Sequence, residues 1–217
     1  MLDAEFETVT LTLDAETGIA RIQLDRPDSL NALSATLRRE YVEAFQSLAD
    51  HDADGDGVPV RAVVVSGAGR AFCAGADVDE FAEGSALVRP DVVYEAASRF
   101  PAPVIAEIHG YCLGGGLALA LDCDFRFAAA DSEFGLPEVD LGLTVAGRTL
   151  PVLRAEVGPS AAKRLAVTGE RIDGSTAAEW GLVEEALPVE EVPERVTRFA
   201  ETLAEKPPLA VRETLDV

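Results

Sequence analysis

The chain has 217 residues, of which 48% are hydrophobic and 26% charged, and its formal net charge at pH 7 is -21. This length allows one domain, residues 1–217, with a sizeable core. The 18 Lys and Arg residues form no cluster, which excludes a nucleic-acid surface, and no apolar run approaches the roughly 20 residues of a membrane span. Three cysteines and an acidic N-terminus predict a cytoplasmic protein without disulfides. The dispersed acids indicate a solvated surface of the kind that suits a salt-adapted, halophilic source.

The N-terminal part of the chain predicts a hairpin followed by a helix. Residues 8–13 and 19–24 are rich in β-forming side chains and flank a short loop that ends in glycine, which is typical of a hairpin. An extended connection over 25–33 leads to Ser34, a favourable N-cap. In the helix that follows, apolar residues recur at helical spacing and are expected to face the core: Leu37, Tyr41, Phe45 and Leu48.

An acidic loop precedes the next strand. Residues 51–57 match the opening of a calcium-binding EF-hand, but the twelfth position of the loop is Val63, where such a site needs a bidentate glutamate. Val63 also belongs to the following strand, which leaves no room for the second helix of the motif. We therefore predict a solvated loop and no metal site.

Two strand-turn-helix units follow, and both have turns of small residues. The β-branched strand 61–65 leads into the turn 66–78, and the apolar strand 104–108 leads into a turn with three adjacent glycines, 114–116. Glycine permits a sharp turn and the close approach of a ligand, and the first amides of a helix lack internal acceptors. The turns are therefore either tight connections without a ligand or two N–H donors that converge on one oxygen as an oxyanion hole.

The remaining elements continue the alternation of strands and helices. Helices are predicted over 91–100, 150–157 and 160–168, the last two separated by a Gly-Pro pair. A final amphipathic helix covers 189–204. This order favours an α/β architecture with right-handed crossovers.

The two glycine-containing turns also carry a family resemblance. Phe72–Asp77 and Gly110–Gly116 resemble two signature segments of the crotonase superfamily, the enoyl-CoA hydratase/isomerase family. The resemblance extends over nearly the whole chain, because three further segments are similar to segments of the family: 26–34, 131–143 and 168–183.

This resemblance implies a more specific fold and assembly. We expect the ββα spiral of the crotonase fold, with a spiral core over about 1–187 and a C-terminal helix and tail over 188–217. Family members usually continue with further C-terminal helices that cover the site and help to build a trimer, so this part is shortened in the printed sequence. A homotrimer or hexamer is nevertheless the expected assembly.

The resemblance further implies acyl-CoA substrates, with coenzyme A as part of the substrate and no separate cofactor. Carried over by motif, the amides of Ala76 and Gly115 hold the thioester carbonyl and stabilise an enolate, which the dipole of the following helix also favours. Glu138 corresponds to a catalytic glutamate of the family. The residues expected to bind substrate or CoA are Ala32, Ala74, Ala76, Asp77, Val78, Gly114 and Gly115.

A second family glutamate is missing. Hydratases of the family carry it three residues after the middle glycine, where this chain has Ala118, one helical turn past Gly115 and expected to face the same pocket. Hydration needs one group that activates water and another that delivers a proton, whereas one base can move a double bond. The resemblance therefore favours Δ3,Δ2-enoyl-CoA isomerase-type proton transfer by Glu138. Enoyl-CoA hydratase in fatty-acid β-oxidation and a non-catalytic CoA-binding member are the alternatives.

Other carboxylates could also supply a second acid. Asp122 and Asp124 lie farther along the glycine helix, and Asp140 follows Glu138 by two residues. Ordinary roles at a helix end, a strand start and a solvated loop are the simpler interpretation. An apolar pocket is expected to surround Glu138 and to raise its pKa, with lining from Leu136, Val139 and Leu143.

A thiol hydrolase is the rival enzyme class. Cys73 and Cys112 lie in the two turns and His109 is near, but a nucleophile needs a base at hydrogen-bond distance. The sequence has no Gly-x-Ser-x-Gly elbow. Buried, structural cysteines are the better interpretation.

Overall fold

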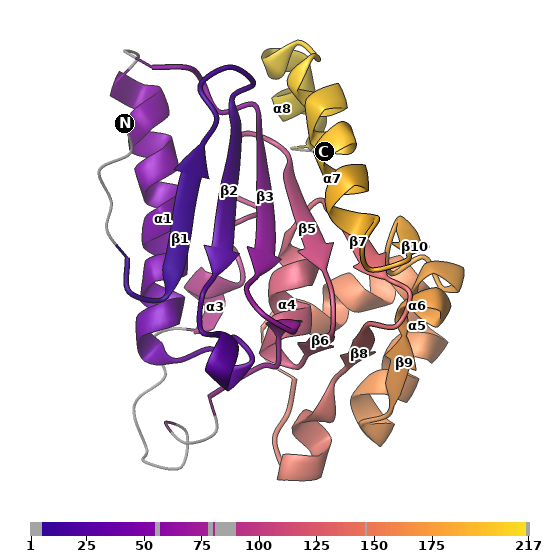
Figure 1. The fold of residues 1–217 in the computed structure, drawn as a ribbon. Coiled ribbons are helices and arrows are strands. Elements are labelled where there is room, and N and C mark those ends of the chain that lie inside the picture. The colour runs from indigo at the N-terminus through magenta and orange to yellow at the C-terminus, as the bar shows by residue number, and fades with distance from the viewer. Residues whose placement is uncertain (1–5, 55–56, 78–79, 81–89, 146, 216–217) are drawn as a thin grey trace.

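The computed structural model describes residues 6–54, 57–77, 80, 90–145 and 147–215 (Figure 1). Val78, which was expected to bind CoA, lies outside them. A six-stranded sheet has the order β1-β2-β3-β5-β7-β10, in which only β1 and β2 pair antiparallel. Its strands are β1 (Val9–Leu13), β2 (Ile19–Leu24), β3 (Ala62–Gly67), β5 (Val104–Ile108), β7 (Phe125–Ala129) and β10 (Glu185–Leu187).

Helices cover both faces of this sheet because its central strands are apolar on both sides. In β3, Val63 and Val65 belong to the core cluster that includes Tyr41 of α1 (Ala35–Asp54), whereas Ala62 and Val64 pack on the side of α7 (Val192–Ala204). Helix α7 buries Val192, Val196 and Ala200, one residue per turn. Figure 1 shows α1 and α7 on opposite sides of the strands. Each fully buried valine stabilises the fold by about 1.5 kcal/mol or more.

A second sheet lies at the carboxyl ends of the main strands. Its order is β4-β6-β8-β9, formed by β4 (Ala71–Cys73), β6 (Tyr111–Leu113), β8 (Glu133–Gly135) and β9 (Arg171–Asp173). Strands β4, β6 and β8 directly follow β3, β5 and β7 along the chain and pair parallel with one another. After β6 the chain enters α4 (Gly115–Asp122). These units are the ββα spiral predicted from the resemblance, and the α/β fold class is confirmed.

The predicted hairpin and first helix are confirmed, and the Ser34 hydroxyl accepts a hydrogen bond from the Leu37 N–H at 3.1 Å as the N-cap. Two helix predictions need correction. Helix α3 (Pro90–Val93) is much shorter than the predicted 91–100. The chain turns after α3, and the Asp122 carboxylate accepts a hydrogen bond from the Ala97 N–H at 2.8 Å in this turn. The predicted pair over 150–157 and 160–168 is α5 (Thr149–Thr168), broken at Gly158, where φ is 78° and ψ is 165°.

The remaining short elements are the 3-10 helices η1 (Pro27–Ser29) and η2 (Pro137–Leu141) and the helices α6 (Gly174–Glu179) and α8 (Pro208–Leu215). Segment η1 interrupts the connection that was expected to be extended. None of the described helices has the length and apolarity needed to cross a bilayer. Among the described residues no group of three acidic, histidine or cysteine side chains is placed to hold a metal ion.

Candidate active site

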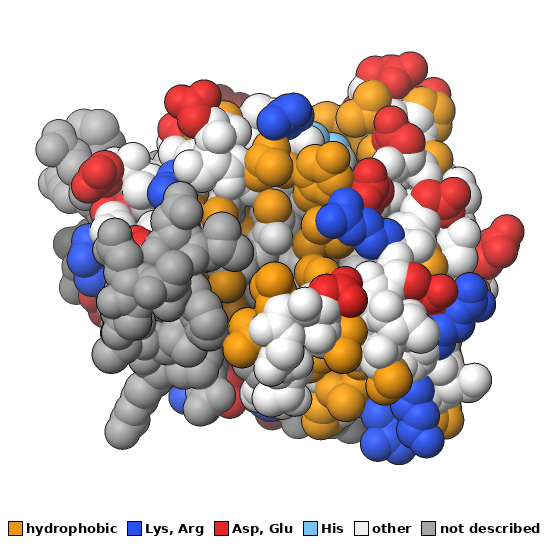
Figure 2. Space-filling view, turned by 90° about the horizontal axis from the view of Figure 1, so that it is seen from below, with side chains coloured by type: hydrophobic (Ala, Val, Ile, Leu, Met, Phe, Trp, Pro, Cys, Tyr) orange, Lys and Arg blue, Asp and Glu red, His pale blue; other side chains and the backbone are white. Residues whose placement is uncertain are grey.

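A cavity of about 380 Å³ lies where the strands of the second sheet end. Its walls come from the residues that follow β4, β6 and β8: Ala74–Ala76, Gly114, Gly115, Pro137 and Glu138. Figure 2 looks onto this face of the molecule, where hydrophobic side chains gather in the middle and acidic ones toward the edge. The register of three parallel strands thus brings three distant turns to one place.

The first two turns are in direct backbone contact. At Gly75, which has a φ of 104°, an added Cβ would lie 2.9 Å from the Leu113 carbonyl oxygen and 3.6 Å from the Gly115 nitrogen. Only glycine permits this approach together with this backbone conformation. The turn is held from the other side by the Leu33 N–H, which donates to the Gly75 carbonyl at 2.8 Å. The Ala76 and Gly115 amides are therefore neighbours.

The second turn begins α4. Gly114 is its N-cap, with φ 51° and ψ -119°, and its N–H donates to the Gly135 carbonyl at 2.9 Å. In the described part of the chain, the Ala76 and Gly115 amides have no backbone acceptor. Two free donors at the positive end of a helix can stabilise an oxyanion. This arrangement agrees with the oxyanion-hole interpretation of the two turns.

Glu138 is the only acidic residue among those that line the cavity in the described structure. It lies in η2, and its Oε1 is 3.2 Å from the position of a Cβ on Gly114. Its Oε2 is buried without a hydrogen-bond partner among the described residues. Burial raises the pKa of the Glu138 carboxyl, because a partly desolvated carboxylate is harder to charge. Such a group is suited to accept and return a proton.

The apolar surroundings of Glu138 differ in part from the prediction. Leu143 lines the cavity, as expected, together with Leu141. Leu136 is completely buried and Val139 is 40% exposed, and neither lines the cavity. Because η2 is a 3-10 helix with three residues per turn, the neighbours of Glu138 in sequence point in other directions.

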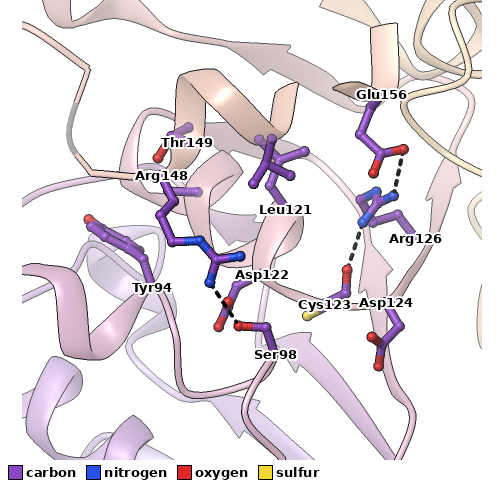
Figure 3. Close-up of a pocket in the computed structure, with 12 residues that line it drawn as sticks. Tyr94, Ser98, Leu121, Asp122, Cys123, Asp124, Arg126, Arg148, Thr149 and Glu156 are labelled. Atoms are coloured by element: carbon purple, nitrogen blue, oxygen red, sulfur yellow. Dashed lines mark hydrogen bonds and ion pairs between the residues drawn. The ribbon is translucent and has the colours of Figure 1, made fainter. Parts of the chain in front are cut away.

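The prediction that Ala118 faces the same cavity is wrong. Ala118 lines a second cavity of about 240 Å³, shown in Figure 3, which also holds Asp122 and Asp124. Both carboxylates accept a hydrogen bond from a backbone N–H at 2.8 Å, Asp122 from Ala97 and Asp124 from Val104. Burial raises the pKa of each aspartate. Their structural roles at the helix end and strand start are confirmed.

Asp140 also lies outside the Glu138 cavity. It is exposed, and its carboxylate lies against Gly169, where an added Cβ would be 2.6 Å from Oδ2. None of the three aspartates therefore stands beside Glu138 as a second acid.

The residues expected to bind CoA fall into two groups. Ala74, Ala76, Gly114 and Gly115 line the cavity itself. Ala32 and Asp77 are joined beside it by Arg26, whose Nη1 donates to the Ala32 carbonyl at 2.6 Å and pairs with the Asp77 carboxylate at 2.9 Å. Arg26 thus ties the two segments together, and the Arg-Pro pair in the N-terminal signature was its only sequence signal.

Arg171 and Tyr111 also line the cavity and were not predicted. The Arg171 guanidinium pairs with Glu133 at 2.8 Å and lies 5.8 Å from the centre of the Tyr111 ring. Strand β9 brings Arg171 in by pairing with β8. The similar segment 168–183 includes Arg171, but a pairing between strands so far apart is not visible in the local sequence.

The cysteines are structural. Cys73, Cys112 and Cys123 are free and buried, and burial raises the pKa of Cys73 to about 12. The His109 ring nitrogen Nε2 lies 2.9 Å from the Gly69 carbonyl oxygen. Thiols that stay protonated are poor nucleophiles, so the interpretation of the cysteines as buried small residues is confirmed.

Comparisons with known proteins agree with this geometry. The family model described as enoyl-CoA hydratase/isomerase matches residues 14–216. Human mitochondrial Delta(3,5)-Delta(2,4)-dienoyl-CoA isomerase is 33% identical over 98% of this chain and 68% of its own length. A probable enoyl-CoA hydratase of Bacillus subtilis is 36% identical over 95% of this chain and 81% of its own.

A solved structure extends the likeness to three dimensions. Enoyl-CoA hydratase from Bacillus anthracis superposes with a TM-score of 0.88 at 34% identity, and the match covers 97% of this chain and 81% of that one. The spiral of ββα units, the paired glycine turns and these matches lead to one conclusion. The chain belongs to the enoyl-CoA hydratase/isomerase family of enzymes, the crotonase superfamily.

Proposed function

We propose that this protein is a Δ3,Δ2-enoyl-CoA isomerase in which Glu138 is the only proton carrier. The observation that carries the proposal is that, within the described part of the chain, Glu138 is the one acid lining a cavity that the residues Ala76 and Gly115 also line. The substrate class follows from the family, whose named relatives act on acyl-CoA thioesters. Coenzyme A is then part of the substrate, and no separate cofactor is needed.

The chemistry begins at the thioester carbonyl. A hydrogen on C2 of a 3-enoyl thioester is weakly acidic, and its removal places negative charge on the carbonyl oxygen. The Ala76 and Gly115 N–H groups would donate to that oxygen, and one such donor contributes about 3 kcal/mol of barrier reduction in measured oxyanion holes. Both donors belong to backbone that other contacts already hold, Ala76 by its bridge to Leu33 and Gly115 as the first residue of α4, so they need no reorganisation during the reaction.

Glu138 completes the proton transfer. Its ionised carboxylate takes the C2 proton, and the electrons of that bond delocalise over C2, C3, C4 and the carbonyl oxygen as a dienolate. The protonated carboxyl then returns the hydrogen to C4, which leaves the double bond between C2 and C3. Atoms and charge balance without water or a second acid, which suits a cavity that Ala118 does not line.

The products distinguish this reaction from hydration. Purified protein is incubated with 3-enoyl-CoA and, separately, with 2-enoyl-CoA at high salt. The products are separated by chromatography, and their masses are measured by mass spectrometry. Isomerisation moves the retention time at unchanged mass, whereas hydration adds the mass of one water. Hydration of 2-enoyl-CoA as the dominant reaction would replace the isomerase by the hydratase that several relatives' names suggest. Tight CoA binding without any product would indicate a non-catalytic member.

Glu138→Gln tests the role of the carboxylate. The amide cannot accept the C2 proton, so turnover of 3-enoyl-CoA is expected to fall by about 100- to 10,000-fold, the usual contribution of a general base. Affinity for a saturated acyl-CoA is expected to change little. The matched control is Glu190→Gln, which removes an exposed carboxylate away from the cavity. Unchanged turnover in Glu138→Gln contradicts the proposed mechanism.

The assembly is proposed on the same basis. We infer a homotrimer or hexamer from the resemblance to oligomeric family members. Mass measurement of the native protein in solution tests this assembly independently of catalysis.

A further inference from the structure

One polar group beside the proposed oxyanion hole has no role in the mechanism above. Tyr94 follows α3, and its hydroxyl lies against Gly115: a Cβ added at Gly115 would be 2.6 Å from Tyr94 Oη. The phenol therefore occupies the space that a side chain at 115 would fill. This contact places the hydroxyl on the residue whose amide is one of the two proposed donors.

The Tyr94 hydroxyl is also available as a donor. It makes no hydrogen bond within the described part of the chain and is not among the fully buried unpaired oxygens there, so a bound ligand can reach it. Burial raises the pKa of Tyr94 to about 12, and the carboxylate of Glu138 adds to the rise. The phenol therefore keeps its proton near neutral pH and can donate it in a hydrogen bond.

The orientation of the ring excludes the nearest polar alternative. Tyr94 lines the same cavity as Ser98, Asp122 and Arg148, but Figure 3 shows its hydroxyl turned away from these three residues. Asp122 and Arg148 are engaged elsewhere, the former at the Ala97 N–H and the latter beside the Ser98 hydroxyl at 3.5 Å. The free hydroxyl points instead to the side of Gly115.

We propose that the Tyr94 hydroxyl is a third donor to the enolate oxygen, beside the Ala76 and Gly115 amides. This inference rests on the proposed function, since it assigns a partner to the same thioester oxygen. A side-chain donor is one of the groups from which oxyanion holes are built, and a neutral phenol in an apolar site is an effective one. A third donor stabilises the dienolate further, which helps a site with only one carboxylate to form it.

The test uses a ligand that reports the enolate directly. Acetoacetyl-CoA forms an enolate that absorbs in the ultraviolet, so the fraction ionised when bound measures how well the protein stabilises that oxygen. Butyryl-CoA has the same CoA portion and a similar acyl length but does not form a comparable enolate, and it measures ordinary binding. Both are titrated near neutral pH into wild-type protein and into Tyr94→Phe, which keeps the ring and removes only the hydroxyl.

We expect Tyr94→Phe to bind the acetoacetyl-CoA enolate roughly 10- to 100-fold more weakly. This loss of affinity corresponds to the free energy of one hydrogen bond to a charged group. Butyryl-CoA affinity is expected to stay within about twofold. In turnover of 3-enoyl-CoA, kcat should fall while KM changes little, since the interaction is strongest when charge develops. The matched control is Tyr41→Phe, which removes a buried phenol hydroxyl of the core that has no hydrogen-bond partner among the described residues.

The outcomes separate the two proposals. If wild-type protein stabilises the enolate and Tyr94→Phe does so equally well, Tyr94 is not a donor and the inference fails while the proposed function stands. Equal losses of enolate and butyryl-CoA binding indicate a packing role and overturn the inference too. If the wild-type protein fails to favour the enolate over butyryl-CoA, both the oxyanion hole and its third donor are refuted.

Discussion

At the scale of single residues, the burial that suits Glu138 to its proposed catalytic role also carries a cost in stability. One of its oxygens is buried without a hydrogen-bond partner among the described residues, and burial raises the pKa of the carboxyl. An unsatisfied buried polar group typically costs about 1–3 kcal/mol. A protein that holds such a group for function is often less stable than a variant with a neutral residue at the same position.

This cost predicts that Glu138→Gln stabilises the fold while it lowers turnover. A carboxyl whose pKa is higher in the folded state binds more protons folded than unfolded, so its contribution to stability falls as pH rises from the unfolded to the folded pKa. Near neutral pH the variant should unfold about 2 °C higher, the effect of roughly 1 kcal/mol in a chain of this size. Below both pKa values the difference should shrink, because wild-type Glu138 is then neutral in both states.

The measurement is a series of calorimetric unfolding curves of wild-type protein and Glu138→Gln from acidic to neutral pH. Glu190→Gln, at an exposed position, is the control for the general effect of removing one negative charge from an acidic protein. A stability gain that is equal in both variants, or independent of pH, would show that burial of Glu138 carries no such cost.

At the scale of elements, the fold depends on how closely β4 and α4 approach each other. A Cβ at Gly116 would lie 2.2 Å from the Cys73 carbonyl oxygen, and real Cβ atoms do not come so close to fixed backbone. The backbone at Gly116 itself is ordinary helix, so the requirement for glycine is purely steric. The same approach brings the Gly115 amide next to the turn that ends in Ala76.

Gly116→Ala is therefore expected to destabilise the protein by at least about 2–3 kcal/mol, at the upper end of ordinary overpacking. Ala118→Ser, two residues later in the same helix, is the matched control because its added hydroxyl enters a cavity of about 240 Å³. Chemical denaturation gives the free energy of unfolding of each variant. A Gly116→Ala protein as stable as Ala118→Ser would mean that β4 and α4 can separate at little cost.

The elements also show where sequence reasoning succeeded and where it could not. The hairpin, the Ser34 cap, strands β3 and β5 and the glycine turn before α4 follow from local signals, namely β-branched runs and glycine positions. The helix expected after the turn 66–78 lies outside the described residues. The short α3 and the direction of Ala118 depend on tertiary contacts, since the first is set by an aspartate more than twenty residues away. Local patterns do not encode such contacts.

The same limit applies to the site. Glu138, Ala76 and Gly115 were predicted because each lies in a motif with recognisable small residues or a Pro-Glu pair, and all three line one cavity. Tyr94 carries no motif, and Arg171 lies in the similar segment 168–183 but was assigned no role there. Strand pairing brings Arg171 to the site, and the turn after α3 brings Tyr94. Their positions become visible only when the strands are assembled.

At the scale of the whole molecule, the dominant feature is charge. There are 39 Asp and Glu residues against 18 Lys and Arg residues, and Figure 2 shows acidic side chains spread along the edge of the site face, with Lys and Arg side chains between them. Self-repulsion of such a surface opposes the compact state. Salt weakens the repulsion, because the Debye length falls from about 10 Å at 0.1 M to about 3 Å at 1 M.

We therefore predict that the unfolding temperature rises with KCl, by roughly 5–10 °C between about 0.05 and 2 M, which corresponds to about 2–3 kcal/mol in a chain of this size. The rise should be steepest below about 0.5 M, where screening changes most.

A fourfold variant separates the effect of surface charge from general effects of salt on stability. It replaces exposed glutamates at and beside α7 that form no ion pair among the described residues by glutamine: Glu190, Glu191, Glu201 and Glu205. Its unfolding temperature should be higher at low salt and rise less. An equal rise in both proteins, or none in either, would exclude self-repulsion as the limit on stability and remove the physical basis for a salt-adapted surface.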